Sequence, residues 1–229
     1  MNRTLLLGAL EAEIGAFAGA MEDAEEVDWR GYRFLEGSLR NRPVVVARVG
    51  VGKSLSAMLT QHLVDRYAPG RIILTGVAGA LAPDLEIGDT IVARTCMQYD
   101  MDATALGFPP GKIPYSPYRV IPCDAALVAG ALEVRPRSGT VRAGHVLTGD
   151  TFMAAGEHER ARYLREELGG DAVEMEGASV GLVATFNEIP FVIIRTISDK
   201  VKHGPKVSFS SFVKGASRNA LDFALHLLT

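Results

Sequence analysis

The sequence predicts an α/β protein in which helices cover a largely buried β-sheet. Continuous apolar runs alternate with amphipathic stretches along the whole 229-residue chain. Strands that are buried on both faces have this unbroken apolar pattern, and helices between such strands favour the α/β class. The chain contains no evident linker, internal repeat or low-complexity segment, so we predict one domain over residues 1–229.

The N-terminal third is predicted to hold a strand, a helix, a hairpin and a second helix. Residues 4–10 form an apolar run typical of a buried strand, and residues 11–20 follow as a helix. Two strand-like runs, 32–39 and 43–49, flank a short polar turn and predict a hairpin. Residues 53–67 carry apolar side chains at the helical period and predict the second helix.

The rest of the chain alternates strands and helices around one long loop. Residues 100–122 hold five prolines, and ordered loops of this length are usually functional or lie at an interface. Helices are predicted at 124–134, at 157–168, after residue 175 through 187, and at the C-terminus. Strands are predicted at 71–75, 89–99, 140–147, 172–175 and 190–197.

Composition and charge exclude several function classes. The formal net charge is −3, and no basic stripe of the kind that binds nucleic acid is present. No apolar stretch approaches the roughly 20 residues of a membrane span, and the first apolar run is too short for a signal peptide. Cys96 and Cys123 lack His or Cys neighbours at metal-ligand spacing. We therefore expect a cytoplasmic protein without metal or cofactor, whose partner is a small molecule rather than nucleic acid or membrane.

A glycine-rich turn at residues 47–54 matches a relaxed Walker A pattern, with Ala47 in place of the first glycine. It lies between a predicted strand and a predicted helix, where a phosphate-binding loop belongs. However, the strand before it is the third in the chain, and no later strand ends in an obvious Mg²⁺-binding Asp unless Asp199 is that residue. A nucleotide-triphosphate switch therefore stays as an alternative, and a turn that approaches a smaller ligand is favoured.

Ionisable or glycine-rich segments follow the ends of four apolar strands, at residues 11–13, 75–79, 174–176 and 195–199. Ligands bind at the carboxyl ends of strands in open α/β sheets, so these segments predict a site. Each acid could instead be a solvated residue at a helix N-terminus, and Arg195 and Asp199 could form a structural ion pair. Strand alternation places Arg195 and Asp199 on one face.

Six segments, in order along the chain, resemble the 5'-methylthioadenosine/S-adenosylhomocysteine nucleosidases of the nucleoside phosphorylase superfamily. They are residues 8–13, 50–53, 75–79, 149–152, 173–176 and 195–199. The resemblance implies a single-domain, three-layer sandwich with a central mixed, twisted β-sheet flanked by helices. It also implies hydrolysis of the bond between adenine and ribose in methylthioadenosine, S-adenosylhomocysteine or 5'-deoxyadenosine.

The resemblance also assigns roles to residues. Asp199 matches the general acid at adenine N7, Glu176 the acid that holds the ribose hydroxyls, and Glu13 the group that orients water, with Arg195 nearby. Such a division of work between carboxyl groups suits an oxocarbenium-like transition state. The other positions implied to contact substrate are Leu10, Val51, Val77, Ala78, Gly79, Phe152, Met153, Glu174, Met175, Ser198, Phe209, Leu106, Phe108 and Pro114.

The sequence departs from the family at the 5' end of the predicted pocket. Val77 stands where the family usually has Ser or Thr, and Leu106 and Phe108 replace residues that are more often Phe and Tyr. In the family this loop closes the pocket of a second subunit, so the resemblance implies a homodimer in which residues 103–114 do the same. The preferred 5' substituent is therefore open.

Other functions remain as alternatives to the nucleosidase. A futalosine or aminodeoxyfutalosine hydrolase would share the fold and the ribose chemistry. A nucleoside phosphorylase is disfavoured because no phosphate-binding arginine is evident near residues 8–13. A nucleoside-binding protein without activity is disfavoured because Glu13, Glu176 and Asp199 are all present.

Overall fold

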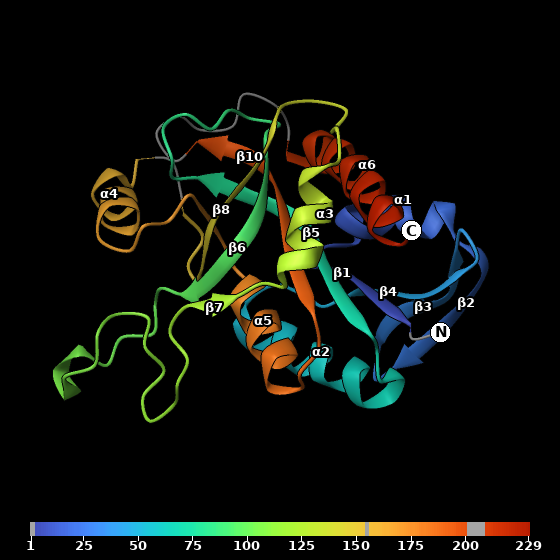
Figure 1. The fold of residues 1–229 in the computed structure, drawn as a ribbon, viewed down its shortest axis with the longest axis horizontal. Coiled ribbons are helices and arrows are strands. Elements are labelled where there is room, and N and C mark those ends of the chain that lie inside the picture. The colour runs from blue at the N-terminus through green and yellow to red at the C-terminus, as the bar shows by residue number, and fades with distance from the viewer. Residues whose placement is uncertain (1–2, 154–155, 201–208) are drawn as a thin grey trace.

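The computed structural model describes residues 3–153, 156–200 and 209–229 (Figure 1). The first half of the chain builds one side of a sheet together with two covering helices. Its elements are β1 (Thr4–Gly8), α1 (Glu11–Ala20), β2 (Glu22–Trp29), β3 (Tyr32–Leu39), β4 (Arg42–Arg48), α2 (Lys53–Tyr67) and β5 (Arg71–Ala80).

The second half completes the sheet and adds four more helices and a short 3₁₀ turn. Its elements are β6 (Thr90–Gln98), η1 (Thr104–Leu106), β7 (Ile121–Pro122), α3 (Ala125–Leu132), β8 (Val141–Thr148), α4 (His158–Glu166), β9 (Ala172–Glu174), α5 (Gly177–Phe186), β10 (Phe191–Lys200) and α6 (Phe209–Leu227).

The sheet is mixed and runs in the order β10-β6-β8-β9-β5-β1-β4-β3-β2. β1 pairs in parallel with β4 and β5, whereas β5 and β9, and β10 and β6, pair antiparallel. β10 also pairs in parallel with β5, so β10, β6, β8, β9 and β5 close into a ring. The predicted α/β class with a mixed sheet flanked by helices is confirmed, and the ring is a feature that the sequence pattern did not predict.

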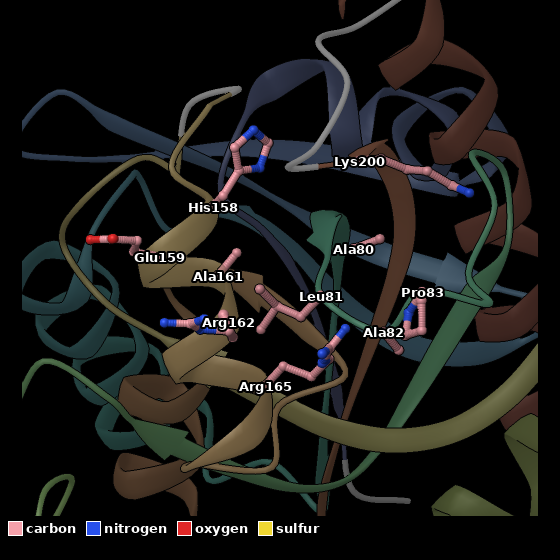
Figure 2. A pocket seen from close by; sticks show the side chains of 10 residues that line it. All are labelled: Ala80, Leu81, Ala82, Pro83, His158, Glu159, Ala161, Arg162, Arg165 and Lys200. Atoms are coloured by element: carbon pink, nitrogen blue, oxygen red, sulfur yellow. The ribbon is translucent and has the colours of Figure 1, made fainter.

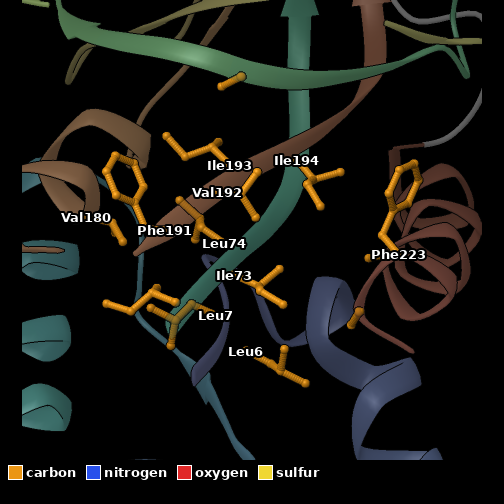
Figure 3. Close-up of a cluster of buried hydrophobic side chains, with 14 of the residues drawn as sticks. Leu6, Leu7, Ile73, Leu74, Val180, Phe191, Val192, Ile193, Ile194 and Phe223 are labelled. Atoms are coloured by element: carbon orange, nitrogen blue, oxygen red, sulfur yellow. The ribbon is translucent and has the colours of Figure 1, made fainter. Parts of the chain in front are cut away.

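The core lies on both faces of the central strands. Leu6 on β1, Ile73 on β5 and Val192 on β10 lie side by side in register, and all three side chains are completely buried. Their face packs toward α1 and α6, where Phe223 contributes to the core (Figure 3). The opposite face carries Leu74 and packs toward α2 and α5 (Figure 3). Burial on both sides explains why these strands are unbroken apolar runs.

β2 and β5 differ from the sequence predictions. β2 was not predicted, because residues 22–29 are mostly acidic and exposed and pair only with β3 at the edge of the sheet. β5 was predicted to end at residue 75, but it continues to Ala80 because its glycine-bearing end pairs with both β10 and β9. The predicted hairpin is confirmed, with Arg40 and Asn41 in the left-handed conformation that tight hairpin turns require.

No helix in the described ranges is long and apolar enough to cross a bilayer.

Candidate active site

A cavity of about 160 Å³ opens where β1, β5, β9 and β10 end. Its walls come from the start of α1, the turn before α2, the end of β5, the segment after β8, and the ends of β9 and β10. All four strand-end segments singled out in the sequence therefore meet at one place. The lining residues are Ala9, Leu10, Glu13, Val51, Val77, Ala78, Gly79, Thr151, Phe152, Met153, Val173, Glu174, Met175, Glu176, Ser198 and Asp199.

Most of these residues were predicted, but some were not. Ala9, Thr151 and Val173 were missed because no catalytic or binding role could be assigned to their side chains from the sequence. Each is next to a predicted residue in the chain. Phe209, predicted to pack on the substrate, begins α6, and its side chain lies outside the described part of the structure.

Glu13 is anchored by backbone amides at the start of α1. Its Oε2 accepts hydrogen bonds from the amides of Ala9 (2.7 Å) and Leu10 (2.9 Å), and its Oε1 accepts one from Val77 (3.1 Å). Burial raises the pKa of the Glu13 carboxyl, and the Arg195 charge and these amides partly offset that effect. A buried carboxylate with a raised pKa and a fixed orientation is a stronger base than an exposed one, which suits it to accepting a proton.

Arg195 lies beneath the cavity and is not exposed at all. It is ion-paired with Glu174 and lies 3.3 Å from Glu176 Oε2, and its Nη1 donates to the Thr75 carbonyl. A side chain at Gly76 could not coexist with this arrangement, because its Cβ would collide with Arg195 and lie 2.7 Å from Glu13 Oε1. Gly76 in β5 therefore makes room for buried charges.

One alternative considered for Arg195 is not observed, and one prediction about it is wrong. It does not form the ion pair considered with Asp199, because Glu174 and Glu176 hold its guanidinium. The two residues do not follow simple alternation either, since a register shift between Ile197 and Asp199 interrupts the pairing of β10 with β5. Arg195 was predicted to lie in the site with Glu13, but it is completely buried and does not line the cavity.

Glu174 and Glu176 lie just before the first residue of α5. Glu174 Oε2 accepts hydrogen bonds from the amides of Glu176 (3.1 Å) and Gly177 (2.7 Å), and its Oε1 accepts the Thr148 hydroxyl. Glu176 Oε1 accepts the amide of Gly52 at 3.0 Å. Burial raises the pKa of Glu176 to about 7, despite the nearby guanidinium of Arg195. One cation thus faces three buried carboxyl groups, a balance that favours retention of a proton.

Asp199 lines the cavity from the end of β10. Ser198 is nearly buried, and its hydroxyl donates a 2.6 Å hydrogen bond to Asp199 Oδ1. Apolar side chains also line the cavity, with Met153 buried and Phe152 two-thirds exposed. The cavity thus combines acidic groups with an exposed aromatic ring.

The hydrogen-bond donors of the Walker-like turn, which a phosphate would need, already bind carboxylates. The amide of Gly52 is directed at Glu176, and the amide of Lys53 donates to Asp150 Oδ1 at 2.7 Å. The Lys53 ammonium donates to Asp100 Oδ1 at 2.6 Å. Backbone amides and a lysine that bind carboxylates in this way do not form the anion cradle of a phosphate loop.

The long loop between β6 and β7 extends away from the body of the molecule (Figure 1). Leu106 is two-thirds exposed there, and Phe108 packs edge-on against Tyr115 with ring centroids 5.4 Å apart. Leu106, Phe108 and Pro114 do not line the cavity of their own chain. Their predicted role requires a second subunit.

A larger cavity of about 520 Å³ lies between α4 and the ends of β5 and β10 (Figure 2). His158, Arg162, Arg165 and Lys200 give it a basic lining. Lys200 is already paired with Glu86, and Arg165 with Glu166. The four basic side chains also spread along the cavity wall and do not converge on one point (Figure 2). Its size therefore does not make it the better candidate for chemistry.

Comparisons with known proteins identify the family of the chain. The sequence matches the phosphorylase superfamily over residues 3–229. It is 34% identical to a 5'-methylthioadenosine/S-adenosylhomocysteine nucleosidase from Shewanella pealeana, with 97% of each chain covered. The fold is similar to that of a nucleosidase of the same description from Colwellia psychrerythraea, solved in complex with adenine, with a TM-score of 0.90, 31% identity and coverage of 99% and 94%. It is also similar to a futalosine hydrolase from Helicobacter pylori, with a TM-score of 0.89, 30% identity and coverage of 99% and 97%.

Proposed function

This chain belongs to the phosphorylase superfamily and, within it, to the 5'-methylthioadenosine/S-adenosylhomocysteine nucleosidases, and we propose that it hydrolyses the N-glycosidic bond of adenine nucleosides. Its substrates would be methylthioadenosine, S-adenosylhomocysteine and 5'-deoxyadenosine. One observation carries the proposal: Glu13, Glu176 and Asp199, far apart in the sequence, line a single cavity. Adenine and a ribose with its 5' substituent would be the products.

The proposed reaction places the purine beside Asp199 and the sugar beside Glu176. Asp199, oriented by the Ser198 hydroxyl, would protonate adenine N7 as the bond between C1' and N9 breaks. The bonding electrons leave with the base, and the sugar becomes oxocarbenium-like. Glu13 would take a proton from a water molecule whose oxygen then bonds to C1'. Glu176 would accept hydrogen bonds from the ribose hydroxyls, Phe152 would stack on the base, and the backbone of Met153 would bind the edge of the base.

Arg195 would act through its neighbours and not on the substrate. It is completely buried and holds Glu174 and Glu176, so its role in the proposal is to position the acid that faces the ribose. Burial raises the pKa of Glu13 and the charge of Arg195 partly offsets that rise, which supports the position near the water-orienting group that the resemblance implied.

Water is favoured over phosphate as the nucleophile by the charge of the cavity. Among the described residues that line it none is Arg or Lys, whereas Glu13, Glu174, Glu176 and Asp199 are acidic. A phosphate dianion would enter a site of the same charge and would find no cation to accept it.

An adenine-release assay tests the proposed function. Purified protein is incubated with methylthioadenosine, with and without phosphate, and the products are separated and identified. We expect free adenine at the same rate in both reactions. Strict dependence on phosphate would indicate a phosphorylase, and absence of adenine would contradict the proposal.

The second candidate, a futalosine hydrolase, is favoured by the similarity to the Helicobacter pylori enzyme. A panel that contains futalosine, aminodeoxyfutalosine and the adenine nucleosides separates the two. The adenine nucleosides should be cleaved with the higher kcat/KM; a preference for futalosine by tenfold or more would reverse the order of the candidates.

We also infer a homodimer in which residues 103–114 close the cavity of the partner subunit. The exposed Leu106 on a loop that extends from the body supports this inference. Light scattering should give twice the monomer mass, and a monomer with full activity would contradict the shared pocket.

The thiols of Cys96 and Cys123 are free and buried, which suits the reducing cytoplasm. A role in methionine salvage would follow from methylthioadenosine as substrate.

A further inference from the structure

We infer that Lys53, Asp100 and Asp150 form a positioning network for the reaction, a role that rests on the proposed function. The three residues come from the start of α2, the loop after β6 and the segment after β8. Lys53 Nζ donates to Asp100 Oδ1 (2.6 Å), and Asp100 Oδ2 accepts the amide of Asp150 (2.9 Å). Asp150 Oδ1 in turn accepts the amide of Lys53 (2.7 Å). The three hydrogen bonds close a cycle, which we call the rim network.

The rim network joins two segments that contribute residues to the cavity wall. On one side, the residue before Lys53 is Gly52, whose amide binds Glu176 Oε1 at 3.0 Å. On the other side, Asp150 precedes the segment 151–153, all of which lines the cavity. A shift in the network would therefore change both the acid that faces the ribose and the wall that faces the base.

The geometry at Gly52 leaves little freedom for the turn. Its φ is +90°, a conformation that favours glycine, and a Cβ there would lie 3.0 Å from Asp150 Oδ1. The same turn places Val51 in the cavity wall. Contacts this close to the substrate matter for rate, since a misplacement of about 1 Å can cost on the order of 100-fold.

The side chains of the network are partly exposed, so their effect on activity can be separated from their effect on folding. The side chains of Lys53 and Asp100 are 16% and 22% exposed, and that of Asp150 is 50% exposed. Ion pairs near the surface contribute little to stability because water screens them. Loss of the Lys53 ammonium should therefore change activity more than it changes folding.

The effect on Glu176 gives a signature that a purely structural role would not produce. The charged groups that face Glu176 are Arg195 on β10, Glu174 on β9 and Glu13 on α1, and the amide of Gly52 stabilises its ionised form. If the turn moves, that hydrogen bond is weakened and the pKa of Glu176 rises. The acidic limb of the pH profile of kcat/KM should then move to higher pH.

The test compares Lys53→Met with Lys53→Arg and with Arg137→Met. Arg137 pairs with Asp222 at 2.6 Å on another part of the surface and serves as the matched ion-pair control. For Lys53→Met we expect kcat/KM for methylthioadenosine to fall about tenfold or more, with the acidic limb shifted upward by about half a pH unit. Lys53→Arg should restore most of the activity, and Arg137→Met should leave both quantities unchanged.

Two results would overturn the inference. One is wild-type kcat/KM and an unshifted pH profile in Lys53→Met. The other is a loss of activity that accompanies a loss of thermal stability without any shift of the acidic limb. Hydrogen exchange of residues 50–53 and 149–153 provides a readout without substrate, and it should be faster in Lys53→Met. Faster exchange in a protein whose wild type releases no adenine would contradict the proposed function and leave the network intact.

Discussion

The cavity beside α4 and the cavity at the strand ends differ in a way that volume does not explain. The cavity beside α4 is about 520 Å³ and the cavity at the strand ends about 160 Å³. Charged groups of the larger one are near the surface, and Lys200 and Arg165 have carboxylate partners beside them. Glu13 and Glu176 at the smaller one are buried and share a single guanidinium. The comparison indicates that chemistry follows desolvated, mutually coupled charges and not empty space.

The largest effect is expected from Asp199→Asn at the smaller cavity. An amide cannot donate the carboxyl proton to the purine, so kcat for methylthioadenosine should fall by about 10²–10⁴. The amide oxygen can still accept the Ser198 hydroxyl, so the thermal unfolding midpoint should stay close to that of the wild type. Steady-state kinetics and calorimetry measure the two quantities. Activity within threefold of the wild type would remove Asp199 from the acid role.

Arg195→Met should reduce stability the most. The substitution keeps an apolar stem but leaves Glu174 and Glu176 buried without their cation. Removal of one partner of a buried ion pair costs about 3–5 kcal/mol of unfolding free energy. Urea unfolding of the variant and the wild type measures this loss. An unfolding free energy within about 1 kcal/mol of the wild type would show that the buried carboxyl groups do not need the arginine.

A smaller effect is expected on the pH dependence of stability. Because the pKa of Glu176 is raised to about 7 in the folded protein, the folded state holds a proton that the unfolded state has lost between pH 5 and 7. Stability should therefore fall as pH rises through this range, by up to about 1.4 kcal/mol per pH unit for this group. The raised pKa of Glu13 acts in the same direction. Glu176→Gln should flatten the slope measured by urea unfolding; an unchanged slope would contradict the assignment.

The smallest effect is expected at the larger cavity. Arg162 lines it without a role in the proposed reaction, so Arg162→Ala should leave kcat/KM unchanged and stability within about 0.5 kcal/mol. Kinetics on the same substrate as for Asp199→Asn provide the comparison. A tenfold loss of kcat/KM in Arg162→Ala would mean that the two cavities had been ranked in the wrong order.

Sequence reasoning located the strand ends better than it located the partners of the charges. The segments around Glu13 and Asp199 follow unbroken apolar runs, and such runs mark the buried strands of a sheet. Which carboxylate holds Arg195 depends on the closure of β10 onto β5 and on a register shift, and neither leaves a local signal. Nor does any local pattern show that Lys53 meets an aspartate 47 residues away.

The acidic edge strand shows a second limit of sequence reasoning. Residues 22–29 have too few apolar side chains at alternate positions to be recognised as a strand. They form β2 because β3 offers a pairing partner. Glycines caused the opposite error in β5, where Gly76 indicated a turn but in fact makes room for Arg195 and Glu13 inside a continuous strand.

A crystal structure of the protein with adenine tests the ranking of the two cavities most directly. We predict that adenine occupies the cavity at the strand ends, with N7 within hydrogen-bonding distance of the Asp199 carboxyl and the ring against Phe152. Adenine bound beside α4, or bound at the strand ends with N7 turned away from Asp199, would contradict the account.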